Sequence, residues 1–120
     1  MAEPTGSSLL PGLTVAVTGA SGNVGTALLR RLTAPGSGVA EVRGLARRVP
    51  PEVAPYDGVR WFSADLGDTA SDTVLAEFVE GADVVIHLAW ALQPGREPDR
   101  LRRVNVDGSW RVARVAAVHG

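Results

Sequence analysis

The sequence of 120 residues contains no cysteine. Disulfide bridges, thiolate nucleophiles and cysteine-based metal sites are therefore excluded. Lysine is also absent, and all twelve basic residues are arginines. A nucleoside-triphosphate P-loop needs a lysine at the start of its helix, so this class of site is excluded as well. The two histidines lie far apart in the sequence and predict no metal cluster.

Excess charge of one sign, aromatic residues and long apolar runs are also lacking. The net charge is −1 and 5% of the residues are aromatic, which gives no electrostatic basis for binding nucleic acid or a membrane surface. No apolar run is long enough to span a bilayer. Residues 1–12 are rich in Ser, Gly and Pro and lack the pattern of a signal peptide, so we expect a flexible leader and a cytoplasmic location. Residues 13–120 predict a single domain.

The most informative segment is residues 18–25, Thr-Gly-Ala-Ser-Gly-Asn-Val-Gly. It follows an apolar run and precedes a helical pattern that places Val24, Leu28 and Leu32 on one face. A strand, a glycine-rich turn and a helix in this order predict a phosphate-binding unit, with a tight loop of an unrelated α/β protein as the alternative. The three glycines would make the turn, admit the pyrophosphate and allow helix and strand to pack closely. Backbone N–H groups and the helix dipole would face the anion.

Strand and helix patterns alternate along the rest of the chain. Strands are expected at 13–18, 41–46, 59–64 and 83–88, and helices around 24–32, 74–79 and 101–115, the second helix ending at Gly81. In the last helix, one stripe is expected to hold Leu101, Val104, Gly108, Val112 and Val115. The connection through residues 50–58 is proline-rich and is expected to lack a full helix. This alternation predicts an α/β fold with a Rossmann-type parallel sheet in the order 3-2-1-4, half of a doubly wound structure. A nucleotide would lie at the carboxyl ends of the strands, between strands one and four.

The glycine spacing, with Thr18 before it and Asn23 and Val24 inside it, resembles the short-chain dehydrogenase/reductase superfamily. It is most similar to the extended branch, the NAD(P)-dependent epimerase/dehydratase family. Three later segments fit the same family in order: Asp65-Leu66, the strand Gly-Ala-Asp-Val-Val-Ile-His-Leu-Ala over 81–89, and Asn-Val-Asp-Gly-Ser over 105–109. The resemblance covers residues 13 to 118 and implies an NAD(P)-binding domain.

The resemblance implies which residues contact the cofactor. The glycine turn would contribute Gly19, Ser21, Gly22, Asn23 and Val24. The Asp65 carboxylate would accept from the adenine amino group while Leu66 covers the ring, with a turn aspartate as the alternative. At the end of the second strand, Arg47 and Arg48 stand where an acid would select NAD, which favours NADP. NAD stays open, since both side chains can instead be solvated surface arginines.

The fourth strand and the last helix carry the remaining candidates. Leu88 and the small Ala89 would run beside the pyrophosphate and ribose, whereas His87 is expected to be a buried, hydrogen-bonded histidine rather than an acid or base. Trp90 would line the substrate or nicotinamide pocket, or cover the core. The family's Asn-x-x-Gly-Thr/Ser element implies that Asn105 organises the active site and that Gly108 permits close packing. Arginines 100, 102, 103, 111 and 114 are expected on a solvated helix face.

No catalytic residue is assigned. The family's chemistry uses a Tyr-x-x-x-Lys pair, but lysine is absent and Tyr56, the only tyrosine, lies in the proline-rich loop. The expected function is the NAD(P)-binding portion of an epimerase, dehydratase or reductase for a nucleotide-sugar or another small carbonyl or alcohol substrate, truncated before a fifth strand. The alternative is a non-catalytic dinucleotide-binding or sensor module. Extended members often dimerise through the helix that contains Asn105, so a homodimer is open, and the strand at 84–86 is expected to form a self-associating sheet edge.

Overall fold

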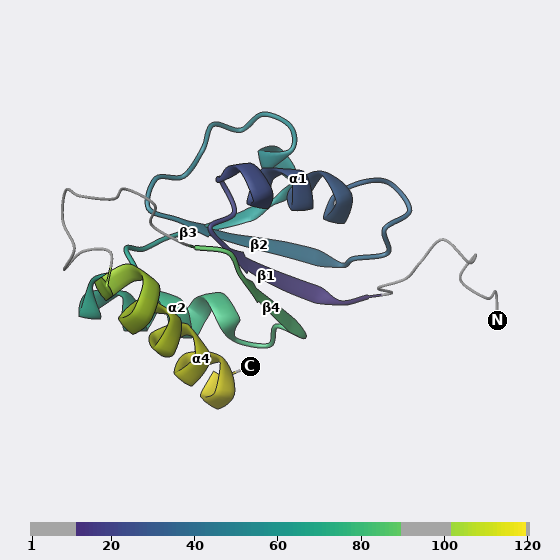
Figure 1. Ribbon diagram of the computed structural model, residues 1–120. Helices are drawn as coiled ribbons and strands as arrows, with labels where there is room; N and C mark the ends of the chain where they lie inside the picture. Colours follow the sequence, from purple (N-terminus) through teal and green to yellow (C-terminus); the bar gives the residue numbers. More distant parts are fainter. Residues whose placement is uncertain (1–11, 90–101, 120) are drawn as a thin grey trace.

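The computed structural model describes residues 12–89 and 102–119. Within them, four parallel strands form one sheet in the order β3-β2-β1-β4 (Figure 1). The strands are β1 (Thr14–Thr18), β2 (Glu41–Ala46), β3 (Arg60–Ser63) and β4 (Val84–His87). The order predicted from the sequence is confirmed, and β1, β3 and β4 are one or two residues shorter than expected. Residues 1–11 of the expected leader and residues 90–101 lie outside the described residues.

Helices cover both faces of the sheet (Figure 1). Helix α1 (Asn23–Leu32) lies on one face, and α2 (Asp72–Val79) and α4 (Gly108–His119) lie on the other. Because successive side chains of a strand point to opposite faces, Val15 and Val17 of β1 pack with α1 while Ala16 packs with α2 and α4. The sheet therefore separates two hydrophobic cores.

Helix α1 begins at the glycine turn and ends at Leu32, shortly before Pro35. Its buried side faces the sheet through Gly25, Leu29 and Leu32. Val24 is 68% exposed, so the expectation that it shares the buried face of Leu32 is wrong. The reason is that Gly25, one residue on, takes the position against the turn. Two arginines in the last turn complement the negative end of the helix dipole.

The connection from β2 to β3 contains a single 3₁₀ turn, η1 (Tyr56–Gly58), and no full helix, as its prolines predicted. The Tyr56 hydroxyl lies 3.0 Å from the Thr26 hydroxyl of α1. The indole N–H of Trp61 donates to the Tyr56 carbonyl over 3.0 Å. The Trp61 ring also lies over Gly44, where an added Cβ would come within 2.7 Å of it. These contacts hold the connection on the α1 face.

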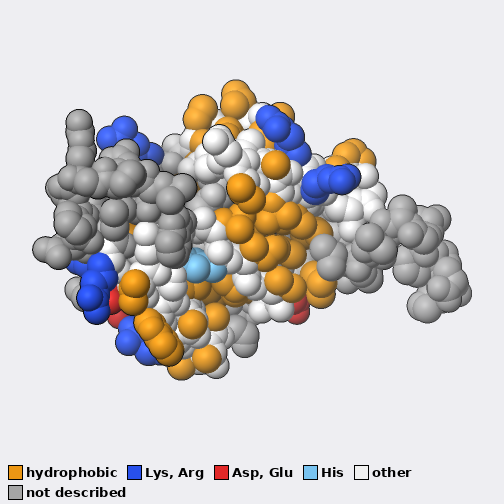
Figure 2. Space-filling view, viewed as in Figure 1, with side chains coloured by type: hydrophobic (Ala, Val, Ile, Leu, Met, Phe, Trp, Pro, Cys, Tyr) orange, Lys and Arg blue, Asp and Glu red, His pale blue; other side chains and the backbone are white. Residues whose placement is uncertain are grey.

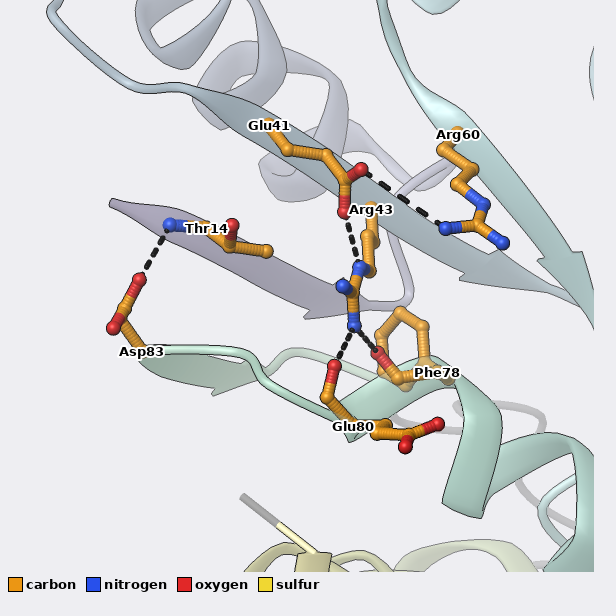
Figure 3. A network of polar contacts seen from close by, with 7 residues as sticks. All are labelled: Thr14, Glu41, Arg43, Arg60, Phe78, Glu80 and Asp83. Atoms are coloured by element: carbon orange, nitrogen blue, oxygen red, sulfur yellow. Dashed lines mark hydrogen bonds and ion pairs between the residues drawn. The ribbon is translucent and has the colours of Figure 1, made fainter. Parts of the chain in front are cut away.

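Arg43 of β2 fastens α2 to the sheet (Figure 3). Its guanidinium donates to the carbonyls of Phe78, at 3.0 Å, and Glu80, at 2.6 Å, and it pairs with Glu41. The last carbonyls of a helix have no intrahelical partner and carry the negative end of the dipole. The Arg43 side chain is only 12% exposed, and these two carbonyls and the Glu41 carboxylate compensate its buried charge. Gly81, with φ +71°, follows directly and ends the helix as predicted.

Helix α4 packs beside α2 through an apolar stripe and one arginine. The predicted stripe is confirmed for its described members, all of which are buried: Val104, Gly108, Val112 and Val115. Arg111 donates to the Leu66 carbonyl, and its Nε lies 2.9 Å from Oδ1 of Asp72 at the start of α2. Its side chain is 11% exposed. The expected solvated face is therefore wrong for Arg111, because these two oxygens replace water around its charge.

Strand β4 is an edge of the sheet that the described residues form. Val84 is exposed and Val85 and Ile86 are partly buried. Figure 2 shows a broad apolar area in the middle of the view, below α1. Ile86 and Leu88 pack only at the margin of the α1 core and remain partly exposed. Among the described helices, none has the length and apolar character needed to cross a membrane.

Candidate functional site

The carboxyl ends of β1 and β4 meet at the first glycine of the turn. Gly19 has φ +66°, a conformation that residues with a side chain rarely adopt. A Cβ on Gly19 would come within 2.7 Å of both the Leu88 carbonyl carbon and the Ala89 nitrogen. The backbone of the turn therefore lies directly against the chain that leaves β4, and glycine is required on both grounds.

The other two glycines differ in what surrounds them. A Cβ on Gly25 would lie 2.8 Å from Ala20 and closer still to the Gly19 carbonyl, so Gly25 lets α1 pack onto the turn. Gly22 is exposed, has φ −76°, and a Cβ there would meet nothing nearer than the Gly19 carbonyl at 3.4 Å. The fold therefore requires Gly19 and Gly25 but does not require Gly22. Its missing side chain leaves open space at the start of α1.

The start of α1 is suited to an anion. Ser21, Asn23 and Val24 are exposed around Gly22, which is the N-cap residue. The first N–H groups of a helix have no intrahelical acceptor, and the dipole makes this end positive. The first turn contains no acidic residue that would repel a phosphate. The structure thus brings together five sequence-predicted residues at this end of α1: Gly19, Ser21, Gly22, Asn23 and Val24.

The end of β2 lies next to the turn. The Ala20 N–H donates to the Leu45 carbonyl over 3.4 Å, and Thr18 is paired in register with Leu45. Arg47 and Arg48 follow this strand and are exposed. The Arg47 carbonyl accepts from the Ser63 hydroxyl at the end of β3, which ties the two strand ends together. Both arginines therefore lie at the carboxyl edge of the sheet. Their contact with a 2′-phosphate stays a prediction.

Asp65 and Leu66 follow β3 and face different surroundings. The Asp65 Oδ1 accepts from the Gly67 N–H at 2.9 Å, the geometry of a turn aspartate. Leu66 is 5% exposed and packs in the core beneath α4. Asp68 is a turn residue, since its Oδ1 accepts from the Ala70 N–H.

A chain of hydrogen bonds joins β1, β4 and α4. The Thr18 hydroxyl lies 2.6 Å from Nδ1 of His87, and Nε2 of His87 lies 2.9 Å from the Ser109 hydroxyl. Ser109 in turn donates to the Asn105 carbonyl over 2.6 Å. The predicted hydrogen bonding of His87 is confirmed, but its side chain is partly buried rather than buried as expected. Burial lowers its pKa below the ordinary value, because the cationic form is desolvated.

Asn105 lies in a π turn, η3 (Arg103–Asp107), directly before α4. Such turns are often found at functional sites. Gly108 is buried where a Cβ would lie 3.0 Å from the Leu66 side chain, so the predicted close packing at this glycine is confirmed. Ala89 is half-buried at the end of β4. Trp90 lies outside the described residues.

One residue of the site carries a role that the sequence did not reveal. Thr18 is fully buried, and its hydroxyl accepts the N–H groups of Leu88, at 3.0 Å, and Ala89, at 3.2 Å. The signal was a hydroxyl at the end of an otherwise apolar strand, where a buried polar group needs partners. Those partners come from β4, 70 residues away in sequence, so the strand pattern could not identify them.

The parallel sheet, its strand order and the glycine turn between β1 and α1 define a Rossmann-type α/β protein. The chain belongs to the NAD dependent epimerase/dehydratase family, whose model matches residues 15–120. An uncharacterised protein of Mycobacterium tuberculosis (strain H37Rv) is 37% identical over 109 residues. That match covers 88% of this chain and 11% of the relative, so the chain spans a small part of the curated proteins it matches.

Solved structures share the same architecture. An epimerase from Methanothermobacter thermautotrophicus matches with a TM-score of 0.73 and 29% identity, over 92% of this chain and 33% of the other. Uronate dehydrogenase from Agrobacterium tumefaciens matches with a TM-score of 0.71 and 21% identity, over 90% and 37%. An NADH-dependent reductase in complex with NAD matches with a TM-score of 0.74 and 24% identity, over 92% of this chain and 53% of the other. At the two lower identities, the likeness shows the fold.

The lowered pKa of His87 predicts how stability depends on pH. The unfolded chain binds the proton near the ordinary pKa of 6.5, whereas the folded chain binds it at lower pH. We therefore expect the free energy of unfolding to fall as the pH drops below 6.5 and to level off below the folded pKa. Unfolding of the chain and of His87→Asn across this range, with imidazole NMR and His119→Asn for assignment, measures the effect. Titration of His87 at or above 6.5 would contradict the burial argument.

Proposed function

We propose that this chain is the cofactor-binding portion of an NAD(P)-dependent epimerase, dehydratase or reductase. The observation that carries the proposal is the contrast among the three glycines. Packing requires Gly19 and Gly25, whereas Gly22 lies in open space at the positive end of α1. A side chain at position 22 would fill that space. In a Rossmann-type sheet, a glycine turn at this place admits the pyrophosphate of a dinucleotide.

The remaining contacts extend along the carboxyl edge of the sheet. The ends of β2 and β3 would take the adenosine half, with Asp65 accepting from the adenine amino group and Arg47 or Arg48 binding a 2′-phosphate. Because the Leu66 side chain is in the core, we assign the adenine edge chiefly to Asp65. Leu88 and Ala89, against which Gly19 packs, would border the pyrophosphate and the nicotinamide ribose.

The cofactor would supply hydride exchange with a carbonyl or alcohol. This chain supplies the positioning: an anion site, a ribose edge and the element that carries Asn105. Tyr56, the only tyrosine, has its hydroxyl bonded to Thr26 on the α1 face, and the sequence contains no lysine to act beside it. We therefore assign binding to these 120 residues. A nucleotide-sugar or another small carbonyl or alcohol is the substrate class we propose for the whole protein.

Gly22→Leu is expected to abolish binding of both NADPH and NADH while the chain stays folded. The new side chain would occupy the phosphate position, and each charge-assisted hydrogen bond lost is worth about 1.5–3 kcal/mol, or roughly tenfold to a hundredfold in affinity. Since Gly22 has an ordinary φ, the cost in unfolding free energy should stay within about 1 kcal/mol. Fluorescence titration and thermal unfolding measure the two quantities.

Two variants frame this result. Ala27→Leu adds the same side chain at an exposed position of α1 and should leave the affinity unchanged. Gly25→Ala should lose stability as well as affinity, because its Cβ would meet the backbone of Gly19 and Ala20. Retention of full affinity by a folded Gly22→Leu chain would show that the dinucleotide does not bind at this turn.

The arginines after β2 predict a preference for NADPH over NADH. A charge-assisted bond to the 2′-phosphate is worth about 1.5–3 kcal/mol, so the preference should be roughly tenfold to a hundredfold. Replacing Arg47 and Arg48 together by alanine should remove the preference and leave the NADH affinity unchanged. Arg30→Ala, in the last turn of α1, removes a positive charge eight residues along the helix from Gly22, roughly 12 Å away, and serves as the control.

The outcomes of this titration are distinct. Equal affinities of the unmodified chain for the two dinucleotides, or a preference for NADH, would refute the assignment of the arginines and leave the glycine turn intact. Absence of binding to either one would refute the dinucleotide function itself.

We also propose that the outward face of α4 and η3 is a homodimer surface. Four exposed apolar residues repeat at helical spacing along it: Val106, Trp110, Ala113 and Ala117. Trp110 is 74% exposed, which is unusual for the largest apolar side chain and typical of interfaces.

Sedimentation of the chain should therefore show a dimer that Trp110→Glu converts to a monomer, because the glutamate cannot be buried without a partner. Val84→Lys tests the other surface available for association, the β4 edge. If Val84→Lys gives the monomer and Trp110→Glu does not, association runs through the sheet edge and the α4 surface is excluded.

A further inference from the structure

The hydroxyl of Thr18 has a fixed direction. Its oxygen accepts two backbone N–H groups, from Leu88 and Ala89. A hydroxyl has two acceptor lone pairs and one proton to donate. With both lone pairs engaged, the Thr18 proton must be donated, and the acceptor within reach is Nδ1 of His87 at 2.6 Å.

This direction continues through the imidazole to α4. Because Nδ1 accepts, the neutral ring carries its proton on Nε2. Nε2 then donates to the Ser109 hydroxyl at 2.9 Å, and Ser109 donates its own proton to the Asn105 carbonyl at 2.6 Å. The Leu88 N–H is shared between the Thr18 hydroxyl and the Thr18 carbonyl at 3.2 Å. The Thr18 hydroxyl, the Nε2–H of His87 and the Ser109 hydroxyl each have one acceptor in this chain, so one tautomer and one orientation of His87 satisfy it.

We propose that His87 is a positioning residue for the dinucleotide site, holding the Leu88–Ala89 backbone against Gly19 and the Asn105 turn at the carboxyl edge of the sheet. The inference rests on the proposed function, because it assigns a role toward the same ligand. It concerns neither acid nor base catalysis, since both ring nitrogens are occupied by Thr18 and Ser109.

The tight packing at Gly19 makes this positioning consequential. An added Cβ there would meet the Leu88–Ala89 backbone at 2.7 Å, so a displacement of this backbone must move the glycine turn with it. The same Thr18 oxygen that holds the backbone directs the imidazole. Removing the Ser109 hydroxyl therefore frees Nε2 of the His87 imidazole. The freed ring in turn orients the Thr18 hydroxyl less firmly, and with it the Leu88–Ala89 backbone.

Ser109→Ala and Ser109→Thr test the proposal in the full chain. Alanine removes the hydroxyl between His87 and Asn105, whereas threonine retains it at the same atom. We expect Ser109→Ala to weaken NADPH and NADH binding about fivefold, the equivalent of one net hydrogen bond, and Ser109→Thr to restore most of the affinity. Titrations are made under conditions in which every variant is fully folded by circular dichroism.

His87→Asn provides an independent break in the same chain. Its amide oxygen lies near the former Nδ1 and can still accept from Thr18, but the shorter side chain cannot reach Ser109. Its effect on affinity should match that of Ser109→Ala, and the double variant should be no weaker than either single one, since both remove one bond. Additive losses would overturn the assignment of a shared chain.

The imidazole itself supplies a spectroscopic signature. Nitrogen NMR of the unmodified chain at neutral pH should show His87 as the neutral tautomer protonated at Nε2, and Ser109→Ala should weaken that preference. A tautomer protonated at Nδ1 would overturn the proposed direction. Variants that lose stability but bind both dinucleotides as tightly as the unmodified chain would reduce His87 to a structural role. Failure of the unmodified chain to bind either dinucleotide would overturn the proposed function and this inference together.

Discussion

The close approach of the turn after β1 to the end of β4 is the constraint on which the rest of the site depends. Gly19 leaves no room for a Cβ against the Leu88–Ala89 backbone, and Gly25 leaves none against the turn itself. The chain is thereby forced from β1 into α1 within a few residues. The N-terminus of α1 then emerges at the carboxyl edge of the sheet, where an anion can reach its free N–H groups.

That approach buries backbone N–H groups of the chain leaving β4, and Thr18 supplies their acceptor. Its hydroxyl takes two N–H groups of the chain leaving β4, and His87 takes the hydroxyl proton. A buried polar chain stabilises one arrangement when every member is satisfied and costs free energy when one is not. The hydroxyl of Ser109 completes the chain on α4. The glycine turn, the edge strand and the last helix are therefore coupled through a single line of bonds.

A second group of stabilising contacts lies at the end of the sheet opposite the candidate site. Arg43 ties β2 to the end of α2 near the strand starts (Figure 3). Asp83, just before β4, accepts the N–H of Thr14 at the same end. The strand ends instead carry the exposed glycine, the two exposed arginines and Asp65. This separation is general for open parallel sheets, in which ligands bind outside the carboxyl ends of the strands.

The sequence by itself determined the order of the elements, the parallel 3-2-1-4 sheet and the place of the glycine turn. These follow from local patterns: apolar runs of strand length, helical spacing, and glycines at 19, 22 and 25. It also predicted the buried stripe of the last helix and the missing helix between β2 and β3, because periodicity and proline act within a few residues.

Only the tertiary structure decided which residues face which partners. Val24 is exposed because Gly25 takes the packed position, and Arg111 is buried because two oxygens from distant segments compensate its charge. The roles of Thr18 and Ser109 depend on contacts across 70 and 22 residues. Leu66 packs under Gly108 rather than at the surface. The physical reason is common to all five residues: burial and hydrogen bonding are properties of pairs that the fold brings together, and a local pattern specifies one member of each pair.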